Sequence, residues 1–151
     1  MALCESVGME TSDTLRTVQL GRMGHGRYKA TNVRGGVLPI GSGEDPDFTP
    51  VELLLAAIAG CSAIDVDAIT GKRAAPESFR VQVRGDKVRD EHGNHLTNLR
   101  VVFDLVFPEG EGGDAARDVL PRAIAQSRDR LCTVSRTVAL GAPVEMEVGP
   151  A

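Results

Sequence analysis

The stretch Thr49–Arg73, TPVELLLAAIAGCSAIDVDAITGKR, predicts a long helix around which the rest of the fold is organised. It begins with a Thr–Pro pair, a good N-cap and first helical residue, and Glu52 lies in the first turn, where the helix dipole favours a carboxylate. Residues 53–59 are all apolar, and no charge follows Glu52 until Asp65. Because a helix that is apolar on nearly every face is normally buried, we predict a long buried central helix.

Cys61 lies in the middle of this predicted helix. At helical spacing it shares a face with Ala57, Ile58, Ile64 and Asp65. A buried cysteine on its own is normally a small hydrophobic residue. A second cysteine, Cys132, follows far downstream in the segment RLCTVSRT, and it makes a reactive pair the alternative reading.

Together the two cysteine segments resemble the OsmC/Ohr family, the osmotically inducible and organic-hydroperoxide-resistance proteins. The family pattern has a proline, an acidic residue, an apolar run, a small residue and a cysteine on a central helix. Far downstream, a second cysteine precedes a small residue or proline, an aliphatic residue and a serine. In this chain the pattern corresponds to Pro50, Glu52, LLLAAIAG and Cys61, and to the CTVS segment that begins at Cys132. The resemblance extends over most of the chain.

The rest of the sequence predicts strands joined mainly by hairpins. The expected order is β-β-β-α-β-β-α-β, with strands at 15–20, 27–33, 37–40, 79–83, 99–107 and 144–148 and a second helix at 114–131. The glycines of 21–26 predict a turn, and 89–98 is expected to form a hairpin tip. We therefore predict an α+β fold with antiparallel sheets around the central helix. The resemblance implies an intertwined homodimer with active sites at the subunit interface.

Length and composition indicate one globular domain, 1–151, in which 1–12, including Cys4, are expected to be flexible. The formal net charge of −4 argues against nucleic acid or an anionic membrane as the main partner. No apolar run of about 18 residues is free of charge, and the N-terminus lacks the basic region and apolar core of a secretory signal. Three cysteines without a dense pattern suit a cytoplasmic protein with reduced thiols.

The resemblance implies reduction of organic hydroperoxides by a thiol peroxidase. Cys61 would attack the peroxide and become a sulfenic acid, and Cys132 would condense with it to a disulfide. An external dithiol, either a small molecule or a lipoyl- or thioredoxin-type protein, would then reduce the disulfide. No cofactor and no metal are expected.

A peroxidatic cysteine among apolar residues needs a positive partner, because burial raises the pKa of a thiol. In the family this partner is an arginine from an N-terminal strand or loop. The candidates in this chain are Arg16, Arg22, Arg27, Arg34 and the downstream Arg136. We favour Arg22, since its segment GRMG resembles the Gly-Arg-x-Gly turn of the organic-hydroperoxide branch.

The acidic residue of the predicted helix departs from the pattern of the best-understood branches. There the acid directly follows the proline, where this chain has Val51. Glu52 is nine residues before Cys61, half a turn off, so a regular helix points it away from the thiol. It resembles another branch of the family and would at least stabilise the helix start. Asp65 faces the same way as Cys61 and would disfavour a thiolate unless an arginine pairs with it.

Other functions remain open at this stage. One alternative is a thiol-dependent activity on another electrophile, and another is a non-catalytic small-ligand-binding or redox-sensing dimer. A zinc site is not favoured, because the cysteines and histidines have no close zinc-site spacing. A Cys–His hydrolase is not favoured either, because no histidine neighbours a cysteine in the sequence. His92 and His95 are expected in an exposed turn.

Overall fold

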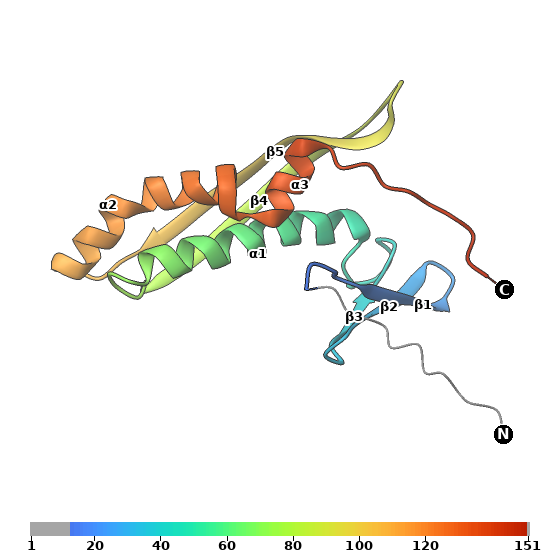
Figure 1. Ribbon diagram of the computed structural model, residues 1–151, viewed down its shortest axis with the longest axis horizontal. Coiled ribbons are helices and arrows are strands. Elements are labelled where there is room, and N and C mark those ends of the chain that lie inside the picture. Colours follow the sequence, from blue (N-terminus) through green and yellow to red (C-terminus); the bar gives the residue numbers. More distant parts are fainter. Residues whose placement is uncertain (1–12, 151) are drawn as a thin grey trace. The chain divides into compact units, whose positions relative to one another are not determined.

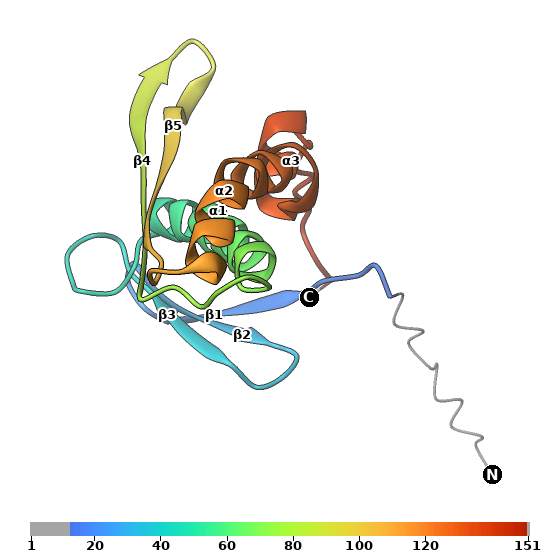
Figure 2. The ribbon, with the colours of Figure 1, turned by 90° about the vertical axis from the view of Figure 1, so that its left-hand side faces the viewer.

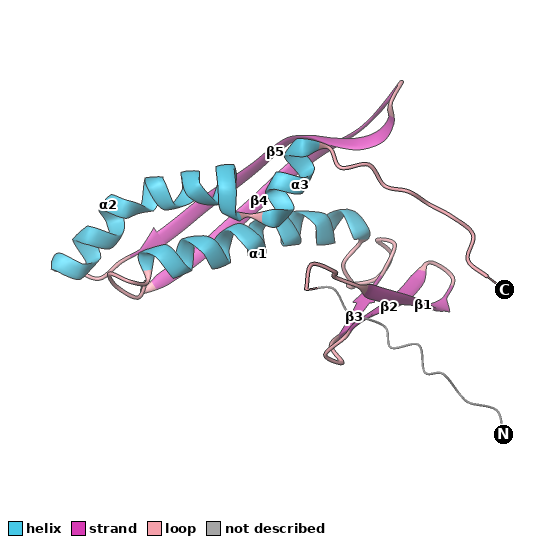
Figure 3. Cartoon of the chain, in the orientation of Figure 1, coloured by secondary structure: helices cyan, strands magenta, loops and turns pink. Residues whose placement is uncertain are grey.

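The computed structural model describes residues 13–150, which form two compact units that meet in the sequence between Pro50 and Val51 (Figures 1 and 3). Residues 1–12, predicted to be flexible, and Cys4 among them lie outside the described residues. The prediction of a single domain over 1–151 is not tested by this division. Each unit is described by itself.

The first unit contains a three-stranded antiparallel sheet in the order β1 (Val18–Gly24), β2 (Arg27–Asn32) and β3 (Val37–Ile40). β1 is longer than predicted and ends later, because the β1–β2 connection needs only His25 and Gly26, with φ 66° at the glycine. The ladder has an irregularity between Arg22 and Gly24. The prediction that Arg22 lies in a turn is therefore wrong: it lies in β1, opposite Tyr28.

The predicted central helix is α1 (Pro50–Thr70), but the chain buries a single stripe of it. The stripe repeats every four residues: Ile58, Ser62, Val66 and Thr70. Burial on nearly every face is a wrong prediction for the single chain, since Ile64 is 72% exposed and only 22% of the most apolar 18-residue window is buried. By length and composition α1 could cross a membrane, but core helices of soluble proteins pass the same test, so this is weak evidence.

A long antiparallel hairpin, β4 (Ser78–Asp90) and β5 (Gly93–Val106), follows α1. Its turn consists of Glu91 and His92 alone, with φ 91° at Gly93, so the predicted tip over 89–98 is too long. His95 lies within the ladder opposite Val88, not in the turn. In the middle of the hairpin, exposed and half-buried positions alternate along both strands, as the sequence pattern predicts for a sheet with one covered face.

The second predicted helix, 114–131, consists of α2 (Glu111–Gln126) and a π-helical turn, η1 (Ser127–Leu131). A further helix that was not predicted, α3 (Thr133–Leu140), follows. α2 continues through Pro121. Figure 2 shows α1 and α2 side by side on one face of the β4–β5 hairpin, with α3 at the end of the layer. Their buried side chains form the core: Ile58, Val66, Phe107, Ala116, Val119 and Ala123.

The predicted last strand at 144–148 is absent. These residues have no regular secondary structure, and Val144, Met146 and Val148 are almost fully exposed. A strand needs a hydrogen-bonding partner, and in the described part of the chain no strand pairs with this segment. The α+β class with antiparallel sheets is confirmed, whereas the predicted order is wrong at its end, where a helix and an extended segment replace the strand.

Candidate functional site

The two distant cysteines meet in the second unit. Cys61, in the middle of α1, donates a hydrogen bond to Cys132, and both are free thiols. Asp65 lies one turn after Cys61, and the two sulfurs and one of its carboxylate oxygens are all within 4.8 Å of one another. The structure thus brings Cys61 and Cys132 together, and it confirms that Asp65 faces the same way as Cys61.

The η1 turn and the start of α3 hold Cys132 in place. The Cys132 N–H donates to the Ser127 carbonyl over 2.9 Å, and Cys132 itself is the N-cap of α3. Its sulfur accepts the Ser135 N–H over 3.3 Å and lies 3.2 Å from the Ser135 hydroxyl oxygen. The Ser127 hydroxyl donates to an Asp65 carboxylate oxygen over 2.9 Å. Single π-helical turns are frequent at functional sites, and Ser127 in this one connects Asp65 of α1 to Cys132.

The surroundings move the pKa values of the two thiols in opposite directions. Burial raises the pKa of Cys61, and the neighbouring Cys132 and Asp65 raise it further, while the N–H of Val134 partly offsets them. Burial also acts to raise the pKa of Cys132, but hydrogen bonds from Ser135, Ser62 and Cys61 outweigh it and lower that pKa. In the reduced pair, negative charge therefore resides more readily on Cys132.

The first turn of α3 contributes to both sulfurs. The N–H of Val134 donates to Cys61 and that of Ser135 to Cys132. Unsatisfied N–H groups and the helix dipole make a helix N-terminus a favourable place for a thiolate. The pair is thus supplied with positive electrostatic potential by the backbone.

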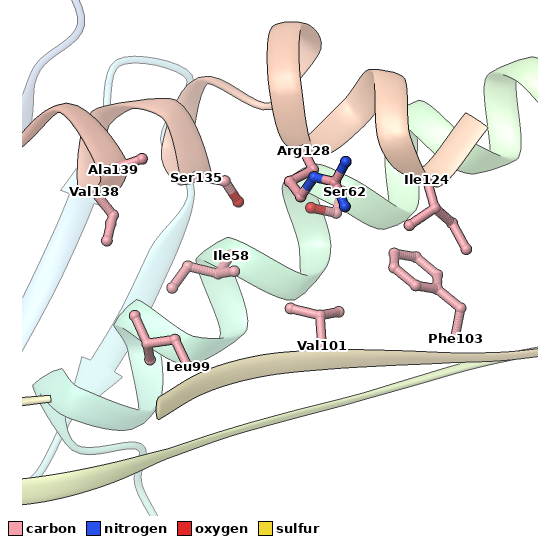
Figure 4. Close-up of a pocket in the computed structure, with 10 residues that line it drawn as sticks. All are labelled: Ile58, Ser62, Leu99, Val101, Phe103, Ile124, Arg128, Ser135, Val138 and Ala139. Carbon is pink, nitrogen blue, oxygen red and sulfur yellow. The ribbon is translucent and has the colours of Figure 1, made fainter. Parts of the chain in front are cut away.

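An apolar cavity of about 330 Å³ lies beside the cysteines, between α1, β5, α2 and α3 (Figure 4). Its polar side chains are Ser62, Ser135 and Arg128. Both serines also hydrogen-bond Cys132, so the cavity adjoins the thiol pair. The remaining lining is apolar: Ile58, Leu99, Val101, Phe103, Ile124, Val138 and Ala139.

The second unit provides several groups around the two thiols, and none of them in the described residues is a candidate arginine. Arg16, Arg22, Arg27 and Arg34 belong to the first unit, where Arg27 forms ion pairs with Asp45 and Asp47 at 3.4 and 3.2 Å. Arg136 lies one turn into α3. The hydrogen bond from Arg128 lowers the pKa of Asp129, and the charge of Arg136 adds to this effect. The choice of Arg22 as the partner of Cys61 stays a prediction.

The acidic candidates differ in position. Glu52 is exposed in the first turn of α1 and is not part of the cluster around Cys61, whereas Asp65 is. Two of the three histidines belong to the second unit: His92 and His95 lie at the end of the β4–β5 hairpin, beside Glu91 and Asp90 respectively.

Sequence reasoning missed the roles of three serines. Ser62 directly follows Cys61, and Ser135 belongs to the CTVS segment, so both were in view without an assigned contact. Ser127 has no local signal, because its contact with Asp65 spans 62 positions and depends on the π-helical turn.

Residues 41–147 match the OsmC family, described as OsmC-like protein. The chain belongs to the OsmC-like family. An uncharacterized protein of Mycobacterium tuberculosis (strain ATCC 25618 / H37Rv) is 33% identical over 130 residues, which cover 84% of this chain and 91% of the relative.

Solved structures show the same fold. The structure of an OsmC-like protein of unknown function from Vibrio cholerae O1 is similar with a TM-score of 0.69 at 13% identity, and the match covers 82% of this chain and 93% of that one. A hypothetical protein from Aquifex aeolicus VF5 is similar with a TM-score of 0.67 at 21% identity, covering 83% and 88%. These likenesses support the OsmC-like fold of this chain and leave its activity to be argued from the site.

Proposed function

We propose that this OsmC-like protein reduces organic hydroperoxides with Cys61 and Cys132. The observation that carries the proposal is the proximity of two free thiols that lie far apart in the sequence, with their sulfurs within 4.8 Å of each other. The apolar cavity beside them suits the carbon chain of an organic peroxide better than it suits hydrogen peroxide. The resemblance of the cysteine segments to the OsmC/Ohr pattern supports the same chemistry.

The proposed cycle has three balanced steps. The Cys61 sulfur attacks one peroxide oxygen, the O–O bond breaks, and an alcohol leaves while Cys61 becomes a sulfenic acid. The Cys132 thiol then displaces water from that sulfenic acid, and a disulfide forms. An external dithiol reduces the disulfide to two thiols and is itself oxidised. Cys61 is the attacking residue in this proposal because it is partly exposed, whereas Cys132 is fully buried.

The active form in this proposal is a cytoplasmic homodimer. The exposed apolar face of α1, including Ile64 and Leu54, is the kind of surface that a second copy of the chain would cover. Free thiols at the site suit a reducing compartment. Arg22 is the proposed source of positive charge for Cys61.

Turnover of cumene hydroperoxide with a dithiol reductant tests the function. Cys61→Ser should abolish turnover, and Cys132→Ser should leave a protein that accumulates sulfinic and sulfonic acid at Cys61, because no resolving thiol remains. Cys4→Ser is the matched control and should keep the wild-type rate. Full turnover in Cys61→Ser would refute the proposal.

A second candidate is a non-catalytic ligand-binding or redox-sensing protein. The observation that favours it is the cavity itself, which combines a large apolar lining with one charged side chain, Arg128. Such a protein would need the cavity but not repeated turnover. A chain that forms one disulfide with peroxide but shows no multiple turnover with any dithiol would support this candidate.

A further inference from the structure

We propose that, in the reduced protein, Cys61, Asp65 and Cys132 form a zinc-binding site. Their donor atoms lie within 4.8 Å of one another, and they come from one turn of α1 and from the start of α3. Two thiolates and a carboxylate are donors that zinc accepts in proteins. No metal was expected from the sequence, because the cysteines and histidines have no close zinc spacing and Asp65 is not a neighbour of Cys132 in the sequence.

The separations fit a tetrahedral ion. With Zn–S bonds of about 2.3 Å and a Zn–O bond of about 2.0 Å, tetrahedral geometry places the two sulfurs about 3.8 Å apart and each sulfur about 3.5 Å from the oxygen. The donors are at most 4.8 Å apart, so the sulfurs would close by at most about 1 Å and each sulfur would approach the oxygen by at most about 1.3 Å. Cys61 and Asp65 lie four positions apart on one helix, a spacing at which two side chains can reach the same ion. The fourth position would be open to water.

Hydrogen bonds already hold the donors in place. The Ser127 hydroxyl holds a carboxylate oxygen of Asp65 at 2.9 Å. The N–H groups of Val134 and Ser135 donate to Cys61 and Cys132 respectively. Partners of this kind orient metal ligands in known sites, and their loss typically weakens metal binding.

The charges of the cluster favour a cation. Asp65 is half-buried beside two thiols, and in the described part of the chain it has a hydroxyl partner and no ion pair. A carboxylate so close to a thiol opposes formation of a thiolate. A divalent ion between the three groups would offset their mutual repulsion, and binding would release the thiol protons.

Metal binding would link the site to its oxidation state. Zinc bound to Cys61 and Cys132 would shield both sulfurs from peroxide. This effect on the peroxide reaction rests on the proposed function. One organic hydroperoxide and two protons would convert the two thiolates to a disulfide, an alcohol and water, and the zinc ion would be released. Binding of the ion to the reduced protein requires no peroxide and is independent of the peroxidase proposal.

The test is a zinc titration of the full-length reduced protein, without oxygen and with a phosphine reductant, against a chromophoric zinc chelator. One ion should bind per chain, and native mass spectrometry should show the same stoichiometry. Substituting cobalt(II) should give thiolate-to-metal charge-transfer absorption, which a site without sulfur ligands would lack.

Variants on α1 and elsewhere assign the ligands. Cys61→Ser and Cys132→Ser should each weaken binding by more than the roughly 10- to 100-fold that follows loss of an outer-shell partner, and Asp65→Asn by at least about 10-fold. Asp67→Asn, an exposed carboxylate on the same helix, and Cys4→Ser are matched controls and should bind like the wild type. Absence of stoichiometric binding, or wild-type affinity in Cys61→Ser or in Cys132→Ser, would overturn the zinc site. Zinc binding without peroxide turnover would overturn only the proposed peroxidase.

Discussion

If the chain forms the proposed homodimer, replacing Ile64 by alanine should weaken the dimer by about 300-fold. Ile64 is 72% exposed on α1, although most residues of this helix are apolar. Ile58, on the same helix, is only 5% exposed. The two isoleucines therefore form a matched pair, in which one side chain serves the core of the chain and the other is available to a second copy.

The expected magnitude follows from the exposed fraction. Replacing isoleucine by alanine removes three carbon atoms, and burial of each contributes about 0.8 kcal/mol. Because Ile64 is 72% exposed in the single chain, its burial in a dimer would contribute 72% of this sum, about 1.7 kcal/mol per chain. In a two-fold symmetric dimer each copy contributes once, so the loss is about 3.5 kcal/mol, or about 300-fold in the dissociation constant. Ile58→Ala should instead lower the free energy of unfolding by about 2–5 kcal/mol, because it leaves a cavity in the core.

Sedimentation velocity over a dilution series measures the dissociation constants of both variants. Chemical unfolding of the dissociated chains then separates the two effects, and Ile64→Ala monomers should unfold like wild-type monomers. The reasoning fails if the wild-type chain is monomeric at tens of micromolar. It also fails if Ile64→Ala leaves the dissociation constant unchanged and lowers the free energy of unfolding as Ile58→Ala does.

Two further predictions concern Cys61. Arg22→Ala should lower kcat/KM for cumene hydroperoxide by at least about 10-fold, because the proposed thiolate loses its positive partner. Arg34→Ala is the control and should change kcat/KM little. Equal kcat/KM in wild type and Arg22→Ala would exclude Arg22 as the partner of Cys61. Burial, Cys132 and Asp65 raise the pKa of Cys61, so its alkylation by iodoacetamide should keep accelerating above about pH 8.5, where an ordinary cysteine levels off. Asp65→Asn should move that acceleration to lower pH, and a profile that does not move would contradict the role given to the carboxylate.

The central helix and the strands of the first sheet could be predicted from local pattern. The Thr–Pro start and the apolar run of α1 are local signals, and the observed helix lies within the predicted stretch. What failed was the burial of α1, because a sequence shows that a face is apolar but not which chain covers it. The missing strand at 144–148 has a related cause, since alternating residues form a strand only where a partner strand is available.

At the site, the two cysteines and the orientation of Asp65 could be predicted from the sequence, whereas the contacts of the serines could not. Helical spacing alone places Asp65 beside Cys61, and the structure confirms it. The contact between Ser127 and Asp65 depends on how α2 turns into η1, which no short pattern encodes. Sequence also missed α3, because Cys132 resembled the end of a helix, whereas its sulfur caps the start of the next one.

The most direct test of the thiol chemistry is the intact mass of the fully reduced protein after stoichiometric cumene hydroperoxide. Formation of a Cys61–Cys132 disulfide predicts a rapid loss of about two mass units, which Cys61→Ser should lack and Cys4→Ser should retain. Peptide mapping should then find the two cysteines linked. An unchanged mass after minutes with peroxide would mean that Cys61 is an inert core thiol, and it would contradict the proposed function.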